Sequence, residues 1–247
     1  AEQVEALIAE YGMPKAREHI LPLLQDALSD GRAEISKRLL KKPSAGHEMA
    51  AAQSFLVDQL VRLIHDIAVN HQYPVSNPSS GERIAVMAVG GYGRGEMAPH
   101  SDVDIAFLTP HKATSWTEQA VEAMLYWLWD LGLKVGQSSR SIDEMVRMSK
   151  DDLSIRTALL EGRYIWGDTA VYEAAKQRFF DDVVAGTDST FVAEKLAERD
   201  ARHKKMGDSR YVVEPNVKEG KGGMRDLQTL YWIGKYIHRV ASAEDLV

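Results

Sequence analysis

Two aspartates separated by a single residue, Asp102 and Asp104, are the residues whose type and spacing best suit chemistry. The apolar residues that follow them, as far as Leu108, are typical of a buried strand. Because side chains alternate along a strand, the two carboxylates are expected on one face, roughly 6.6–6.8 Å apart along it. Carboxylate oxygens held on a rigid strand are suitable ligands for hard divalent cations. The pair therefore predicts a metal site.

A glycine-rich turn precedes the aspartates. The apolar run from Ile84 to Val89 is short and ends at Gly90 and Gly91, which predicts a core strand followed by a turn. Without a Cβ, glycines let the backbone approach a phosphate closely. The glycine spacing fits neither the GxxxxGK[ST] loop nor the dinucleotide-binding pattern. A glycine pair is often only a turn, and Asp-x-Asp is often a solvated loop end, but together they indicate nucleotide chemistry.

These residues carry a resemblance to a known family. The pattern G-G-x-G-R-G-E-x-x-P-x-S-D-x-D, from Gly90 to Asp104, resembles the nucleotidyltransferase domain of bacterial bifunctional PII uridylyltransferase/uridylyl-removing enzymes, in the polymerase-β-like nucleotidyltransferase superfamily. The stretch 213–228 (VEPNVKEGKGGMRDLQ) is a narrower match, and 127–136 and 156–161 agree with it. The resemblance covers most of the chain from about residue 50 onward.

The resemblance implies an α+β fold, with a small mixed sheet flanked by helices and further helices at both ends. It divides the chain into an N-terminal helical segment at 1–48, a nucleotidyltransferase core at 49–150, and a helical region at 151–247 whose glycine-rich loop, 214–223, lines the site. The HD-type phosphohydrolase and ACT domains of such enzymes are not found in these 247 residues.

The implied reaction transfers UMP from UTP to a tyrosine of the PII nitrogen-regulatory protein and releases pyrophosphate. Asp102 and Asp104 are the expected catalytic residues and metal ligands, with Mg²⁺ as the default ion and Mn²⁺ as its substitute. A glycine loop that leads into a helix N-terminus is also a natural anion site. The residues expected to bind the nucleotide are Gly90, Gly91, Arg94, Ser101, Lys218, Lys221 and Arg225.

One feature departs from the superfamily pattern. Such enzymes commonly carry a third carboxylate on a later strand, where it can activate the attacking hydroxyl. The corresponding stretch, 133–140, contains Lys134 and no acidic residue. Four acids elsewhere are candidate substitutes, namely Asp130, Glu161, Glu214 and Glu219.

Composition limits the class of protein. The chain has 247 residues, a hydrophobic fraction of 45%, no cysteine and a formal net charge of −6. Disulfides and thiolate metal sites are therefore excluded, and a reducing cytoplasm suits the chain. No apolar run approaches the roughly 20 residues that span a bilayer, so no membrane partner is expected. The acidic balance argues against a general nucleic-acid binder.

The flanking elements are expected to be mostly helical. Residues 1–41 read as helix broken near Pro14 and Pro22, and an amphipathic helix at 49–69 includes Phe55 in its apolar stripe. A helix ending near residue 130 has Trp129 toward the core, and 133–139 forms a third strand. A helix at 152–164 has Tyr164 inward. Further helices are expected at 169–183, 188–206 and 224–240, with a short strand at 211–213.

Two other functions remain open on the sequence. The chain can be another enzyme of the superfamily, such as one that transfers an adenylyl group to a protein or a small molecule, since base preference is not legible in the motif. It can also be a non-catalytic module that binds a nucleotide or a partner protein. The lack of a third acid favours that reading, and the intact aspartate pair argues against it.

Overall fold

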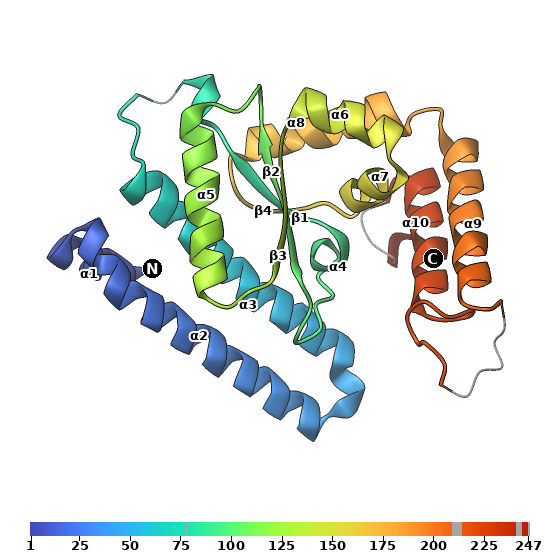
Figure 1. Ribbon diagram of the computed structural model, residues 1–247, viewed down its shortest axis with the longest axis horizontal. Helices are drawn as coiled ribbons and strands as arrows, with labels where there is room; N and C mark the ends of the chain where they lie inside the picture. The colour runs from blue at the N-terminus through green and yellow to red at the C-terminus, as the bar shows by residue number, and fades with distance from the viewer. Residues whose placement is uncertain (78, 209–213, 241–243, 247) are drawn as a thin grey trace. The chain divides into compact units, whose positions relative to one another are not determined.

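The computed structural model describes residues 1–77, 79–208, 214–240 and 244–246 (Figure 1). The chain divides into two compact units. The first contains Ala1–Met145 and Glu161–Lys176, and the second contains Val146–Leu160 and Gln177–Val247. A small mixed sheet with helices forms the first unit and helices form the second, so the expected α+β fold is confirmed.

Four strands in the order β3-β2-β1-β4 form the sheet of the first unit. The strands are β1 (Ala85–Ala88), β2 (Val103–Thr109), β3 (Val135–Ser141) and β4 (Arg163–Gly167). Strand β1 is antiparallel to both β2 and β4, whereas β2 and β3 are parallel. The three strands expected from the apolar runs are confirmed, with β3 displaced two residues toward the C-terminus. Strand β4 was not expected.

Helices pack on one face of this sheet. Helix α3 contacts β4, and α5 contacts β3 (Figure 1). Val86, Ile105 and Phe107 belong to the core cluster that also contains Ile64 of α3 and Leu128 of α5. The helices and helical turns of the first unit that lie outside the glycine-rich motif are α1 (Glu2–Tyr11), α2 (Met13–Lys41), η1 (Pro43–Ala45), α3 (Gly46–Asp66), η2 (Ile67–Gln72), η3 (Ser80–Glu82) and α5 (Ser115–Asp130).

Helix α2 corrects the expected break at Pro22. The helix runs through that residue, although a proline inside a helix removes one backbone hydrogen bond. Its buried residues Ile20, Leu24 and Leu28 recur at helical spacing and belong to the core, so tertiary packing outweighs the local cost. The expected break near Pro14 is confirmed, because α1 ends at Tyr11 and Pro14 lies in the first turn of α2.

Two expected core positions were wrong. Phe55 is 63% exposed, because α3 buries Val57, Leu60, Val61 and Ile64 instead. Trp129 is 47% exposed, whereas its neighbour Trp127 is fully buried. Arg17 stacks 4.1 Å from the Trp127 ring centroid, and the Trp127 indole N–H donates to Gln72.

Tyr164 lies in β4 and not in a helix. Helix α7 (Leu153–Leu160) ends three residues before the strand begins, and Tyr164 is paired with Met87 of β1. The run from Arg163 to Gly167 has five residues and polar ends, too few to separate strand periodicity from helix periodicity in the sequence.

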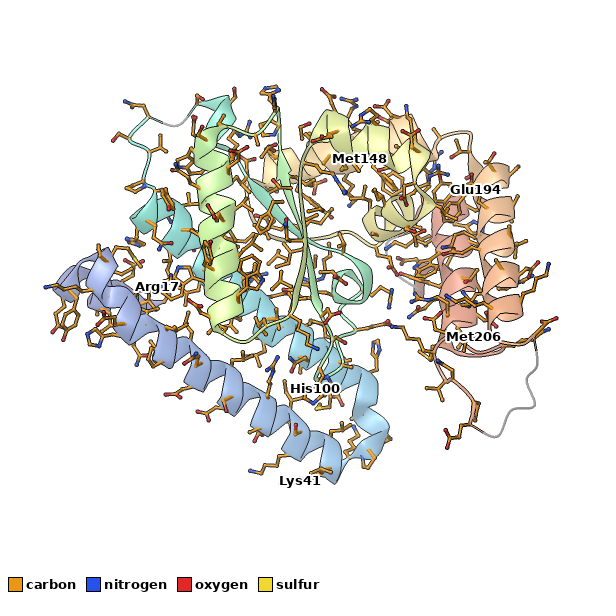
Figure 2. The ribbon with its side chains drawn as sticks, in the orientation of Figure 1. Arg17, Lys41, His100, Met148, Glu194 and Met206 are labelled. Carbon is orange, nitrogen blue, oxygen red and sulfur yellow. The ribbon has the colours of Figure 1, made fainter. Side chains whose placement is uncertain are left out.

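The second unit is helical. Helix α6 (Ile142–Asp151) crosses the boundary between the units, as does α8 (Thr169–Phe179), and α9 runs beside α10 (Figure 1). Phe191 stacks on Tyr236 with ring centroids 3.8 Å apart, and Arg156 pairs with Glu194, which is labelled in Figure 2. The remaining elements are η4 (Phe180–Val184), α9 (Asp188–Lys205), α10 (Met224–His238) and η5 (Glu244–Leu246).

Helices near 169–183, 188–206 and 224–240 are thus confirmed. The strand expected at 211–213 lies outside the described residues. In the part of the chain that the structure describes, no helix combines the length and apolarity that crossing a membrane requires.

Candidate active site

The glycine turn after β1 is a single helical turn, α4 (Gly90–Gly93). Gly90 adopts a φ of +59°, a left-handed conformation that side chains other than glycine rarely occupy. The N–H of Val89, just before the turn, donates to the carbonyl of Asp104 at 3.0 Å. A Cβ on Gly90 would lie 3.5 Å from Oδ2 of Asp104. The turn therefore begins beside the second aspartate.

Asp104 lies between two glycines. In β2 it is paired with Gly136 of β3, where a Cβ would lie 2.3 Å from its Oδ1. Its neighbours Val103 and Ile105 are buried in the core, so Asp104 faces the opposite side of the sheet. Glycine on either side leaves this carboxylate space that a larger residue would fill.

The two aspartates influence each other electrostatically. Burial, followed by the negative charge of Asp102, raises the pKa of Asp104. Asp102 itself is exposed and immediately precedes β2. A divalent cation bound to both carboxylates would relieve this repulsion and replace the lost hydration. The oxygen donors and the space around Asp104 therefore fit a divalent metal ion.

Arg94, at the end of the turn, is already paired within the fold. Its guanidinium donates to Glu96 at 2.8 Å and also to Glu161, and its side chain is only 12% exposed. These two carboxylates thus offset the positive charge of Arg94, which the sequence predicted to bind the phosphates of the nucleotide. Ser101 is also engaged, because its Oγ accepts the N–H of Ala98 at 3.0 Å.

The turn and the aspartates are joined by an exposed loop. His100, labelled in Figure 2, lies in this loop beside Ser101. The hydrogen bond from Ala98 to Ser101 closes the loop just before the aspartates begin. Ser101 therefore has at least a structural role, and its expected contact with the nucleotide stays a prediction.

The other three cationic residues expected to bind the nucleotide belong to the second unit. Lys221 donates to Asp208 at 2.8 Å, and Arg225 donates to Glu219 at 3.2 Å. Lys218 begins a turn in which its N–H donates to the Asn216 side chain at 3.0 Å. The loop then enters α10, as the sequence indicated, with the N–H of Met224 donating to the carbonyl of Val217.

Comparison with known proteins matches both units. A family model described as a nucleotidyltransferase domain matches residues 76–165, and one described as GlnD PII-uridylyltransferase matches residues 190–247. Curated relatives named bifunctional uridylyltransferase/uridylyl-removing enzyme are 66% identical in Novosphingobium aromaticivorans and 65% identical in Erythrobacter litoralis, each over all 247 residues. Over its whole length, the chain is similar to enzymes of this name.

The matches cover all of this chain but only part of each relative. A further relative, from Rhodospirillum rubrum, is 55% identical over 246 residues. The match takes in all of this chain but only 26% of that relative, and 27% of the first two. The chain thus spans about a quarter of the length of the curated PII-uridylyltransferase relatives it matches.

The third carboxylate is not found on the strand where nucleotidyltransferases commonly carry it. The β3 residue paired with Asp104 is Gly136, and the next residue on that face is Ser138. Of the substitutes considered, Glu161 pairs with Arg94, Asp130 pairs with Arg17 at 2.5 Å, and Glu219 pairs with Arg225. Glu214 is exposed. Among the described residues, no group of three or more His, Asp or Glu is placed to hold a metal ion.

The sequence did not reveal two residues that hold the turn, one directly and the other through the first. Arg163, the first residue of β4, donates to main-chain carbonyls of the turn and to Asp58 of α3. The pair is 105 positions apart in the chain, and Arg163 was assigned to a helix. Asp58 gave one local signal, since it is an acidic residue next to the apolar stripe of an amphipathic helix, and it is 6% exposed in the structure.

Proposed function

We propose that this chain transfers UMP from UTP to a tyrosine of the PII nitrogen-regulatory protein and releases pyrophosphate. Asp102 and Asp104 hold Mg²⁺ in this proposal. The observation that carries it is the carboxylate of Asp104 set between Gly90 and Gly136, beside a turn suited to phosphate. The choice of uridylyl transfer follows from the names of the curated relatives.

In the reaction, the tyrosine oxygen loses its proton to solvent and forms a bond to the α-phosphorus of UTP. The bond from that phosphorus to the oxygen bridging to the β-phosphorus breaks, and pyrophosphate leaves with its electron pair. Bound divalent ions stabilise the charge on the attacking and leaving oxygens in such reactions. The chain itself holds the triphosphate in position, which is the larger part of catalysis in phosphoryl-type transfer.

Backbone N–H groups of the turn supply part of that positioning. The first N–H groups of a helix have no acceptor within the helix, and no side chain caps α4. The N–H groups of Gly90 and Gly91 are thus suited to donate to phosphate oxygens. That Lys218, Lys221 and Arg225 also bind the nucleotide is part of the same proposal. We also propose a cytoplasmic location. The chain has no cysteine and forms no disulfide, so it does not need an oxidising compartment.

The test is transfer of radiolabelled UMP from UTP to purified PII protein. Wild type is expected to label PII in the presence of Mg²⁺, and the double variant Asp102→Asn/Asp104→Asn is expected to lose transfer at least 1,000-fold, by analogy with the loss of other transition-state electrostatics. A matched control, Asp26→Asn/Asp30→Asn, removes two exposed carboxylates from α2 and is expected to transfer normally. Transfer by the first variant at the rate of the control would exclude this metal site.

A further inference from the structure

The side chain of Arg163 connects α3 to the glycine turn. Nη1 and Nη2 donate to the two carboxylate oxygens of Asp58 at 2.8 and 3.1 Å. Nη2 also donates to the carbonyl of Tyr92 at 3.2 Å, and Nε donates to the carbonyl of Gly93 at 3.3 Å. The guanidinium carbon lies 5.5 Å from the Tyr92 ring centroid. One cation therefore holds two successive carbonyls of α4.

Both partners of this cation are fixed by burial. Asp58 is 6% exposed and Tyr92 is 1% exposed. One helical turn before Asp58, the hydroxyl of Ser54 accepts the N–H of Met97 at 3.3 Å, just beyond the turn. Helix α3 thus contacts the glycine-rich motif at two points along its length, through side chains that are polar and buried.

The sheet places Arg163 where the chain leaves it for the turn. Arg163 is paired with Ala88, the last residue of β1, and α4 begins two residues later. At Gly93, a Cβ would lie 2.3 Å from the carbonyl oxygen of Glu161, so the turn also packs directly on the backbone that leads into β4. The turn can shift only if these contacts break.

The hydrogen bonds from Arg163 to the carbonyls of the turn also affect the N–H groups that are proposed to bind the nucleotide. The carbonyls of Tyr92 and Gly93 lie at one end of α4, and the N–H groups of Gly90 and Gly91 lie at the other. Fixing the carbonyls fixes the peptide planes of this single turn and hence the direction of its N–H groups. Charge-assisted bonds from a planar, forked donor hold such geometry more tightly than a flexible ammonium does.

We propose that Arg163, held in place by Asp58, is a positioning residue that fixes the glycine turn for the triphosphate of the bound nucleotide. This role rests on the proposed function of the turn. It assigns to β4 and α3 a part in substrate binding, although neither supplies a group that touches the substrate.

A second ion pair on the same two strands provides a matched control. Arg83 and Asp168 form two hydrogen bonds, at 2.5 and 2.8 Å, just before β1 and just after β4. Because the strands are antiparallel and Ala85 pairs with Gly167, this pair lies at the end of β1 and β4 away from the turn. Like the Arg163 pair, it joins an arginine to an aspartate at an end of β4, but at the end away from α4.

The experiment compares Arg163→Lys with Arg83→Lys by calorimetric titration of UTP with Mg²⁺, well below both melting temperatures. Lysine keeps the charge but cannot reach the carboxylate and both carbonyls together. Arg163→Lys is expected to raise the Kd for UTP at least tenfold. Both variants are expected to lower the melting temperature to a similar degree. Arg83→Lys is expected to leave the Kd for UTP within twofold of wild type.

Equal Kd values for Arg163→Lys and wild type, or an equal loss in both variants, would overturn the positioning role. If Arg163→Lys does not fold, Asp58→Asn is used, since it frees the guanidinium while keeping the volume. It is expected to raise the Kd at least threefold, and a folded Asp58→Asn with the wild-type Kd would also overturn the role. A wild-type chain that binds no nucleoside triphosphate contradicts the proposed function as well, whereas unimpaired binding by the variants contradicts the positioning role alone.

Discussion

At the scale of single residues, the glycines of the turn serve different purposes. Gly90 needs glycine for its positive φ, and Gly93 needs it because the Glu161 carbonyl leaves no room for a Cβ. Gly91 has neither constraint, since a Cβ there would meet its neighbours at 3.6 Å or more, an ordinary contact distance. Gly91 is therefore the position where fold and substrate approach can be separated.

We expect Gly91→Ala to leave the free energy of unfolding within about 0.5 kcal/mol of wild type while it weakens UTP binding several-fold, since the new methyl group blocks phosphate. Gly93→Ala is expected to cost about 1–3 kcal/mol, as overpacked sites do. Urea denaturation and calorimetric titration measure the two effects. A Gly91→Ala variant that binds UTP as tightly as wild type would make the turn a structural feature only.

What could be predicted at this scale depends on sequence separation. Asp102 and Asp104 are two positions apart, so strand alternation alone predicts that they share a face. The buried partner of Arg94 could not be foreseen in the same way, because Glu161 lies 67 positions away. The Arg163–Asp58 pair is separated by 105 positions. Pairings at such distances follow from the order of the strands, which no local pattern specifies.

At the scale of elements, β1 and β2 could be predicted because each is mostly apolar and is followed by a turn signal. Strand β4 could not be, since its run is short and follows α7 after two residues. At Pro22 the sequence predicted a break in the helix, because proline disfavours a helix interior. The packing of the long helix α2 outweighs that local preference. Local propensity decides an element only where tertiary contacts do not oppose it.

The ends of β1 and β4 make a pH-dependent contribution to stability. Hydrogen bonds from Arg83 lower the pKa of Asp168. The unfolded carboxyl titrates near 3.9, so this contribution is complete above that pH and is lost as the pH falls through the lower folded pKa. Arg83→Gln is expected to cost up to about 1 kcal/mol at pH 7, since the pair is partly exposed.

Urea denaturation of wild type and Arg83→Gln at pH 7, 5 and 3 measures this contribution. The difference between the two proteins is expected to stay constant from pH 7 to 5 and to shrink at pH 3 and below. A difference that grows on acidification would contradict the assigned pairing of Arg83 with Asp168.

At the scale of the whole molecule, the two family matches lie mainly in different units. The nucleotidyltransferase match at 76–165 contains the turn and both aspartates, and the narrower match at 190–247 contains Lys218, Lys221 and Arg225. The α+β class followed from the strand and helix signals together with the family resemblance. The division into units made of discontinuous stretches did not, because it depends on where β4 returns to the sheet.

The central claim is that the aspartate pair and the glycine turn hold one metal–triphosphate group. Thermal unfolding of wild type and of Asp102→Asn/Asp104→Asn, with UTP, ATP, CTP or GTP and with or without Mg²⁺, tests it directly. A ligand at 100 times its Kd stabilises the folded state by about 2.7 kcal/mol, which is readily detected. We expect stabilisation by UTP above the other nucleotides, only with Mg²⁺, and none in the double variant. Equal stabilisation by UTP without Mg²⁺, or in the double variant, would contradict the account.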